Sequence, residues 1–353
     1  MPILTRFPPA AGPLGADRRL PHNFPIRGDG SGVDDRELLV RLSQGRLSGD
    51  TLARAFGLTR AAVWKRIQGL RAAGVEIDGR VGEGYGLARP LELLDAERIR
   101  TALAPAAHTE LGALEIAWSL ASSNSTLLAR PAPARGSEVL LAERQTGGRG
   151  RRGRVWASPL AAHLYLSVAR GFDGGLGRLG GLSLAAGVAV AEALRAAGFA
   201  TVGLKWPNDL LAEGRKLGGL LVEGGGEFAG PARAVIGLGL NVRMPAASAA
   251  AIGQPWTDLA TLAGAAVSRN AIAAAVLSQL LPALALFDAQ GLAPFLPRYA
   301  ALDLLAGRAV RIDDGGGARE GVALGLADDG ALRVAFADGE RSLHAGEVSV
   351  RPA

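Results

Sequence analysis

Cysteine is absent from this chain of 353 residues. Its absence excludes disulfides, thiolate metal sites and covalent thioester chemistry. Histidine is scarce, and its four copies are scattered along the chain: His22, His108, His163 and His344. They lie too far apart for a sequence-local zinc motif, so we expect each histidine to have a structural role.

Lysine is also nearly missing. Of the 39 basic residues only Lys65, Lys205 and Lys216 are lysines, so the composition favours arginine wherever a positive charge suffices. A position that keeps lysine against this bias is typical of a site that needs a compact point charge on a flexible stem, able to follow a carboxylate or phosphate oxygen. Chance is the alternative, because three residues are few.

Long apolar runs are missing too, apart from Ala/Leu-rich stretches that we interpret as core helices. Residues 1–32 are rich in Pro, Gly and Arg without an apolar signal core, and we expect a disordered tail. The formal charge of +6 is modest, so a local basic face matters more than the total. The length predicts about two or three domains, and the 48% hydrophobic content is ample for their cores. Because a membrane-spanning run and a signal core are both missing, we expect a cytoplasmic protein with no membrane partner.

The most informative segment present covers residues 145–156. Four glycines and four arginines fill residues 147–154. Glycine lets backbone N–H groups approach a ligand closely, and arginine supplies forks of donors suited to phosphate or carboxylate. The segment therefore predicts a mobile loop that an anionic ligand orders; a solvated basic loop or a nucleic-acid arm are the alternatives.

Residues 33–92 predict a winged helix-turn-helix domain. Asp34 and Glu37 form a capping-box pattern, while Ser48 and Thr59 can cap two further helices on either side of a turn at Gly57. An alternating, glycine-containing segment at 75–88 predicts the wing hairpin. The pattern indicates a domain that can bind DNA.

The third helix of this domain is expected to expose a basic face. Residues 54–71 carry five positive charges and no acid. We expect Arg60, Lys65, Arg66 and Arg71 to be exposed, with the first three contacting DNA. An ordinary solvated helix face is the alternative.

Residues 93–305 alternate between strand and helix patterns and predict a mixed α/β domain. Strands are expected at 139–143, 163–169, 204–206, 217–223 and 234–242, and helices at 179–197 and 270–289. Residues 243–255 are Ala-, Ser- and Pro-containing and predict a second mobile loop. Residues 306–353 contain short strands with Asp-Gly turns, which favour a small β-barrel.

Three motifs in order give this chain its resemblance to a known family. They are Gly-Arg-Gly-Arg-Arg-Gly-Arg with a nearby Trp at 148–156, Lys-Trp-Pro-Asn-Asp at 205–209 and Arg-Lys-Leu-Gly-Gly at 215–219. Over about residues 35–351 the chain resembles the bifunctional biotin–protein ligases and biotin-operon repressors of bacteria. The resemblance implies an α+β multidomain protein: a winged helix-turn-helix, a central class II synthetase-like ligase domain and a C-terminal SH3-like barrel.

The resemblance also implies an activity. The family activates biotin with ATP to biotinyl-5′-adenylate and transfers biotin to a lysine of the biotin carboxyl carrier protein of acetyl-CoA carboxylase. Because a carboxylate must approach an α-phosphate, arginine, lysine and Mg²⁺ are needed to screen the two anions. The expected partners are this carrier protein, operator DNA and a second copy of the chain, bound when the adenylate forms.

Site residues follow from the matched motifs. The resemblance assigns biotin binding to these positions: Ser122, Ser123, Asn124, Gln145, Arg149, Gly150, Arg151, Lys216 and Gly219. It assigns the adenylate to these: Arg149, Arg151, Arg154, Trp156, Asn208, Asn241 and Trp256. It assigns catalysis to Lys205, Lys216, Arg151 and Asp209. Asp209 would also bind Mg²⁺, and Gly237 and Gly239 would line the pocket.

Two positions depart from the family pattern. Arg144 replaces an aromatic before Gln145, and Ala157 replaces a larger residue after Trp156. Both positions adjoin the glycine–arginine loop, so they put the strength of its closure in question.

Structural alternatives accompany the motif residues. Asn208 and Asp209 also suit an ordinary turn, and the tryptophans suit a core. Gly237 and Gly239 would also suit a strand packed against a close neighbour.

Three other functions compete with a biotin ligase and repressor. A lipoate–protein ligase shares the acyl-adenylate logic, but Gln145 and the Ser122–Asn124 turn suit a ureido ring better than a dithiolane. A transcription factor that has lost catalysis is a second alternative, against which the retention of Lys205 and Lys216 argues. A ligase whose DNA-binding role has been lost or changed is the third.

Overall fold

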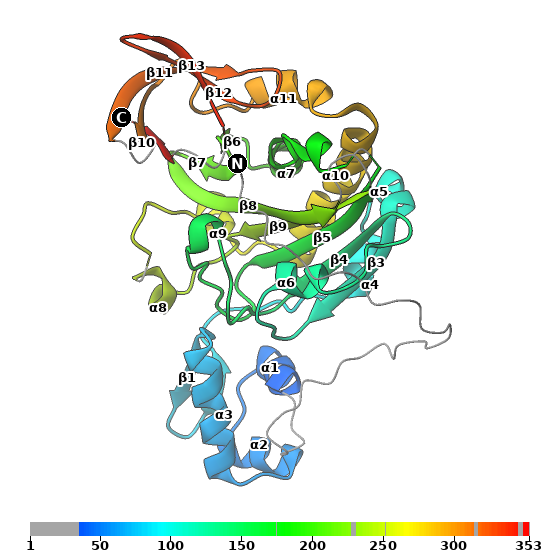
Figure 1. Ribbon diagram of the computed structural model, residues 1–353. Helices are drawn as coiled ribbons and strands as arrows, with labels where there is room; N and C mark the ends of the chain where they lie inside the picture. Colours follow the sequence, from blue (N-terminus) through cyan, green and yellow to red (C-terminus); the bar gives the residue numbers. More distant parts are fainter. Residues whose placement is uncertain are drawn as a thin grey trace.

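The computed structural model describes residues 35–173, 175–226, 231–250, 252–313, 317–344 and 349–352. Three parts follow one another along the molecule in Figure 1. A small helical domain lies at one end, a helix-covered sheet lies in the middle, and an antiparallel sheet lies at the other end. The expected tail at 1–32 and the capping residue Asp34 fall outside the described residues.

The N-terminal domain has the predicted winged helix-turn-helix form. Its elements are α1 (Asp35–Ser43), α2 (Gly49–Phe56), α3 (Arg60–Ala72) and the antiparallel hairpin β1 (Ile77–Arg80) and β2 (Gly84–Leu87). The Ser48 hydroxyl accepts a hydrogen bond from the amide of Thr51, and Thr59 accepts one from the amide of Ala62. Gly57 ends α2 in the left-handed region at φ 63°. These two N-caps and the turn are therefore confirmed.

The expected exposure of Arg66 and Arg71 is wrong. Arg66 turns toward α1, where its guanidinium lies 2.9 Å from the Asp35 carboxylate and its side chain is only 16% exposed. Arg71 donates from Nε to the carbonyl of Ile77 at 2.9 Å and so joins α3 to the wing. Both arginines hold the domain together, which leaves Arg60 and Lys65 as the exposed basic residues of α3.

The central sheet has seven strands in the order β3-β4-β5-β9-β8-β7-β6. Their bounds are β3 Leu111–Ala117, β4 Ser137–Ala142, β5 Leu164–Phe172, β6 Val202–Lys205, β7 Asp209–Ala212, β8 Arg215–Gly226 and β9 Ala232–Leu240. Only β3 and β4 pair in parallel among these strands. All five expected strands are found, whereas β3 and β7 were not expected.

The two faces of this sheet have different coverings. Val139, Leu141, Val168 and Ile236 belong to the main core, which also includes residues of α7 (Leu182–Ala196) and α10 (Arg269–Gln290). Their neighbours of opposite parity, such as Leu140, Ala169 and Val235, pack with Leu127 of the short α6 (Ser123–Leu128). Because side chains alternate along a strand, odd-numbered positions of β5 and β9 face α6, and this face carries the site.

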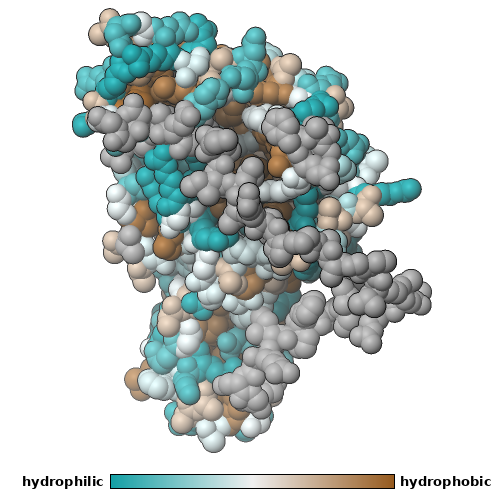
Figure 2. Space-filling view, viewed as in Figure 1, coloured by the Kyte–Doolittle hydropathy of each residue, from teal (hydrophilic) through white to brown (hydrophobic). Residues whose placement is uncertain are grey.

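The remaining helices are short. They are α4 (Ala96–Thr101), α5 (Pro105–Glu110), α8 (Ala246–Ala249), α9 (Leu259–Ala263) and α11 (Leu296–Ala300), with 3₁₀ turns at Arg151–Gly153, Leu176–Leu179 and Ala293–Phe295. The α8 helix lies in the segment expected to be a mobile loop. On the face shown in Figure 2, hydrophilic residues cover much of the winged helix and the C-terminal part, with apolar residues in smaller areas between them.

Among the described residues, α10 alone is long and apolar enough to cross a membrane by length and composition. Most of its apolar stretch is buried inside the protein, as in the core helix of a soluble domain. The prediction of a core helix at 270–289 is confirmed, as is that of a helix at 179–197, where α7 lies.

The C-terminal part is a five-stranded antiparallel sheet in the order β13-β12-β11-β10-β14. Its strands are β10 Ala309–Asp313, β11 Ala318–Leu326, β12 Leu332–Phe336, β13 Gly339–Leu343 and β14 Ser349–Pro352. The buried Trp206 donates from its indole N–H to the carbonyl of Gly330 at 3.0 Å. This bond fixes the end of β6 against the C-terminal part.

The winged helix is fixed to the central domain at a segment just beyond the glycine–arginine loop. The amide of Leu160 donates to the carbonyl of Ala73 at 2.8 Å, and Leu160 and Ala161 are buried in the apolar core of the winged helix. Nearby, Arg243 donates to the carbonyl of Pro90 at 3.0 Å. The segment that follows the glycine–arginine loop and the first residue of the 243–255 segment therefore both contact the N-terminal domain.

Candidate active site

Small residues on the α6 face of the sheet form the floor of a cavity. Gly237 pairs with Ser167 and Leu221, and Gly239 pairs with Gly219, so these positions of β5, β9 and β8 share one face. A Cβ atom at Gly237 would collide with Asn124, and one at Gly239 would collide with Trp156. Both glycines therefore make room for side chains that border the cavity, in agreement with their predicted place in the pocket.

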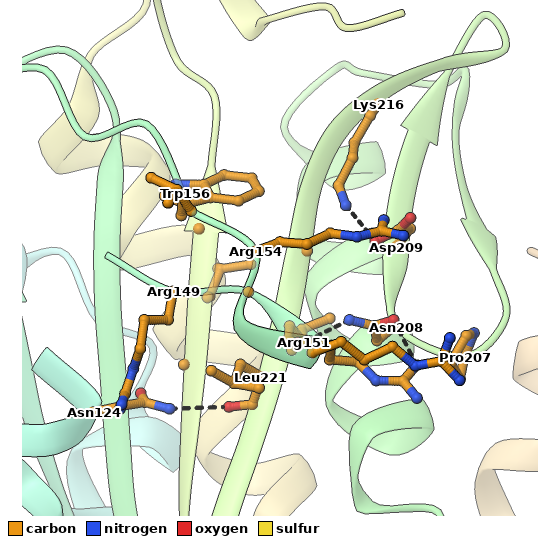
Figure 3. Close-up of a pocket in the computed structure, with 18 of the residues that line it drawn as sticks. Asn124, Arg149, Arg151, Arg154, Trp156, Pro207, Asn208, Asp209, Lys216 and Leu221 are labelled. Carbon is orange, nitrogen blue, oxygen red and sulfur yellow. Dashed lines mark hydrogen bonds and ion pairs between the residues drawn. The ribbon is translucent and has the colours of Figure 1, made fainter. Parts of the chain in front are cut away.

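Neutral polar groups form one end of the cavity. The Gln145 side-chain oxygen accepts from the amide of Ser123 at 2.8 Å and from its hydroxyl at 3.1 Å. The Asn124 amide donates to the carbonyl of Leu221 at 3.1 Å (Figure 3) and to the Glu223 carboxylate at 2.9 Å. This network fixes the orientation of both amides, which is what a site needs to recognise a ligand with defined donors and acceptors.

Two members of this network were not expected. The buried Ser167 hydroxyl lies 2.7 Å from the Ser123 hydroxyl and donates to the Asn124 oxygen at 2.6 Å. Glu223 accepts from Asn124 and lies 3.5 Å from the Arg149 guanidinium. Strand parity could have identified both residues, but only if the face of the sheet that carries the site had been known.

The glycine–arginine loop folds over the cavity. The amide of Gly150 donates to the carbonyl of Arg154 at 2.7 Å, and the amide of Trp156 donates to the carbonyl of Gly148 at 2.9 Å. Within this turn the Arg149 side chain donates to the Ser125 hydroxyl at 2.7 Å, on the neutral side of the cavity. The predicted loop thus borders the site through its own backbone turn and through its arginines (Figure 3).

Charged groups converge at the other end of the cavity. Lys205 pairs with Asp209 across β6 and β7, and Asp209 pairs with Gly219 across β7 and β8. The Lys216 ammonium lies 2.6 Å from the Asp209 carboxylate. Lys205 and Lys216, which are eleven residues apart in sequence, therefore both border the charged end of the cavity.

Arginines complete this charged end. Arg151 donates to the side-chain oxygen of Asn208 at 3.1 Å, and Arg154 extends across the cavity toward Asp209 (Figure 3). Burial lowers the pKa of Arg151, and the neighbouring Arg152 charge lowers it further. Crowded positive charge next to a single carboxylate leaves this end suited to a ligand with more than one negative group.

Trp156 lies between the two ends. Its ring is 5.8 Å from the Lys216 ammonium, and its buried indole N–H has no hydrogen-bond partner within the described protein. An unpaired buried donor at a cavity wall suits a ligand acceptor.

All the residues predicted for the active site can now be divided into two groups. Those that line the cavity are Ser122, Ser123, Asn124, Gln145, Arg149, Gly150, Arg151, Arg154, Trp156, Lys205, Asn208, Asp209, Lys216, Gly219, Gly237 and Gly239. Asn241 and Trp256 do not line it in this structure. The Asn241 amide donates to the carbonyl of Thr257, and Trp256 lies against the backbone of Lys216 as a bridge partner.

The described residues contain no cluster of three or more His, Cys, Asp or Glu side chains suited to a metal. Mg²⁺ does not require one, because it is usually held by one or two carboxylates together with substrate phosphates. Asp209 supplies one such carboxylate at the cationic end, so the donor set fits a phosphate-borne Mg²⁺. His163 does not line the cavity: it is buried, its Nδ1 accepts from the amide of Val242, and burial lowers its pKa to about 3.

The fold and the site define a class of protein: an α/β enzyme whose cavity suits a polar ligand with more than one negative group, on the same chain as a winged helix-turn-helix domain. Residues 121–241 match the biotin/lipoate A/B protein ligase family, residues 36–86 match an HTH domain, and residues 306–351 match the biotin protein ligase C-terminal domain.

Individual relatives are more specific. Bifunctional ligase/repressor BirA of Salmonella typhimurium is 38% identical over 317 residues, which cover 90% of this chain and 97% of the relative. A biotin–[acetyl-CoA-carboxylase] ligase of Mycobacterium tuberculosis is 39% identical over 227 residues, covering 62% of this chain and 82% of the relative. The structure of a biotin protein ligase from Aquifex aeolicus in complex with biotin and ATP superposes with a TM-score of 0.58 at 26% identity, covering 69% of this chain and all of that one.

This chain belongs to the family of bifunctional ligase/repressor proteins. It is a biotin–protein ligase with an N-terminal DNA-binding repressor domain. The matched C-terminal domain, the Mycobacterium tuberculosis relative and the Aquifex aeolicus structure are all named for biotin, so the lipoate alternative is set aside.

Proposed function

We propose that the cavity binds biotin with its ureido ring at the neutral end and its carboxylate at the cationic end. The observation that supports this proposal is the polarity of the cavity. The fixed amides of Asn124 and Gln145 lie at one end, and Lys205 and Lys216 lie at the other. Ser122 and Ser123 contribute hydroxyls beside the ring. Arg149 and Gly150 close the loop above it, and Gly219 leaves room below.

ATP enters at the cationic end, and a carboxylate oxygen of biotin attacks its α-phosphorus. The new O–P bond forms as the bond to the β-phosphate breaks and pyrophosphate leaves. Lys216, Lys205 and Arg151 screen the two approaching anions and stabilise the charge that develops on the phosphoryl oxygens. Mg²⁺ held by Asp209 and the phosphates would supply further Lewis-acid stabilisation. Arg154, Trp156 and Asn208 border the adenylate. Asn241 and Trp256 support this end of the site indirectly: Asn241 bonds the carbonyl of Thr257, and Trp256 pairs with the backbone of Lys216.

The adenylate then reacts with an acceptor amine on a second protein. An uncharged lysine of a biotin carboxyl carrier protein attacks the acyl carbon, and AMP leaves as the amide forms. Until then water must be kept out, because it would attack the same carbon. The loop that contains Arg149 to Arg154 provides this cover when the ligand orders it.

Adenylate binding is coupled to repression in this proposal. Ordering of the loops lowers the entropy lost when two copies associate. A dimer places two winged helices on a pseudo-palindromic operator, and this raises the affinity over that of one copy. The protein acts in the cytoplasm, where the carrier protein and the operator are both present.

Two measurements test this function. Incubation with biotin, ATP, Mg²⁺ and a carrier domain should add one biotinyl group to the carrier, as detected by mass spectrometry, and lipoate in place of biotin should give no product. Sedimentation should show a monomer becoming a dimer with biotin and ATP, and DNA binding should tighten under the same conditions. Biotin transfer by a protein that stays monomeric, with unchanged DNA affinity, would leave a ligase whose DNA-binding role differs from that of a biotin-responsive repressor.

A further inference from the structure

An exposed tryptophan lies in the middle of α3, the second helix of the helix-turn-helix. In such domains this helix is the recognition helix, which enters the major groove of DNA. The side chain of Trp64 is 55% exposed, whereas the other face of α3 buries Val63, Ile67 and Leu70. A large apolar side chain on a solvated helix face loses favourable burial unless a ligand covers it. Nothing in the ligase reaction uses this residue, because α3 lies outside the active site.

The surroundings of Trp64 favour nucleic acid as the ligand. Residues 51–72 contain no acidic side chain, and Arg60 and Lys65 are both exposed on α3. Arg60 lies 3.3 Å from the exposed carboxylate of Asp50 in α2. Ala61 and Gly69 are exposed and small, and a Cβ atom at Gly69 would meet nothing within 4 Å. The exposed surface of α3 therefore combines positive charge with small residues on either side of the indole. Small residues at these positions leave room for the helix to enter the major groove.

The indole is held in a fixed orientation. With its amide oxygen turned toward them, Gln68 accepts from the Trp64 indole N–H at 3.3 Å and from Arg71 at 3.0 Å. Arg71 is in turn fixed to the wing through the carbonyl of Ile77. Trp64 is thus an oriented apolar surface, since its one polar atom is already satisfied within the domain.

We propose that Trp64 determines operator specificity by packing against the C5-methyl group of a thymine. On the major-groove edges of the base pairs, nearly all recognition groups are hydrogen-bond donors or acceptors, and the thymine methyl is the apolar exception. An indole whose N–H is occupied has no hydrogen bond to offer and so selects for that methyl. Gln68 is a positioning residue that orients the ring. This inference rests on the proposed repressor function and adds the base that the helix reads.

Base analogues test the proposal directly. The full-length protein, with biotin and ATP, is first used to enrich binding sequences from a random duplex library. Each thymine of the enriched half-site is then replaced by deoxyuridine, which lacks only the methyl group. At one position the wild-type protein should lose about fourfold in affinity per half-site, the equivalent of burying one methyl group. Trp64→Ala should bind the thymine and uracil duplexes equally well, and Trp64→Phe should retain part of the preference.

Lys65→Ala is the matched control, because Lys65 is the exposed neighbour of Trp64 on the same helix. It should weaken binding to both duplexes equally and reduce the salt dependence, as loss of a phosphate contact does. Biotin transfer by all variants should stay at the wild-type rate, which shows that the substitutions leave the ligase domain unaffected. Unchanged far-UV circular dichroism and thermal unfolding should show that the winged helix remains folded.

The outcomes separate cleanly. If Trp64→Ala keeps the full thymine preference of the wild type, the proposal is overturned while the repressor function stands. If the wild-type protein enriches no sequence at all, the repressor function itself fails, and the specificity proposal fails with it.

Discussion

Lys216 offers the most direct test of how the cationic end works. Its ammonium lies 2.6 Å from the Asp209 carboxylate, and the two side chains are only 18% and 19% exposed. Charges in such a partly buried place interact more strongly than charges in water. At an effective dielectric constant of about 20, two unit charges about 4 Å apart interact by about 4 kcal/mol.

Lys216→Ala removes this charge from the phosphate that reacts and leaves the Asp209 carboxylate unpaired beside it. Both changes oppose the approach of two anions, so we expect adenylate formation to slow by about 10²- to 10³-fold. The assay is single-turnover release of pyrophosphate with saturating biotin and ATP. DNA binding without ligand should not change, because Lys216 lies outside the winged helix.

Arg215→Ala is the control, since it removes a positive charge from the adjacent residue of β8. The Arg215 side chain is 42% exposed and lies 2.6 Å from the exposed Glu213 carboxylate, and such surface pairs contribute about 1 kcal/mol or less. Its adenylation rate should therefore stay within a few-fold of wild type. Equal rates for Lys216→Ala and wild type would refute the electrostatic role of Lys216, and equal losses in both variants would show that general charge, not position, matters.

Three further predictions concern order and stability. Trypsin should cleave the loop within Arg149 to Arg154 more slowly when biotin or its adenylate is bound, and equal cleavage in both states would contradict ligand-induced ordering. Arg269→Met should lower the free energy of unfolding by about 3–5 kcal/mol, because Glu143, 2.7 Å away and equally buried, would lose its partner; the added change Glu143→Leu should recover part of the loss in urea titrations. His163 has a folded pKa lowered to about 3, so the unfolded chain takes up its proton first as the pH falls; stability is therefore lost below about pH 6.5, by about 2 kcal/mol at pH 5, and this part of the loss should vanish in His163→Asn.

Local chemistry made much of the molecule predictable. The caps at Ser48 and Thr59 depend only on neighbouring residues, so their pattern is legible in the chain. The two unusual lysines, Lys205 and Lys216, stood out against an arginine-rich composition, and the sheet brings both to one cavity.

What depends on pairing between distant strands was not predictable. Ser167 and Glu223 face the site only because β5, β9 and β8 pair in one particular register, and a shift by one residue would turn both side chains to the opposite face. Arg66 was misplaced for a similar reason. Its spacing along α3 suits an exposed face, but the domain places Asp35 of α1 within reach.

The junction at Leu160 also decides how the chain can be divided. The apolar core of the winged helix is completed by Leu160 and Ala161, which belong to the central domain in sequence. A ligase fragment without the winged helix would present these side chains to water within a few residues of Trp156. The winged helix and the ligase domain therefore share an apolar core at their boundary. A different DNA-binding domain could replace the winged helix only if it also buried Leu160 and Ala161.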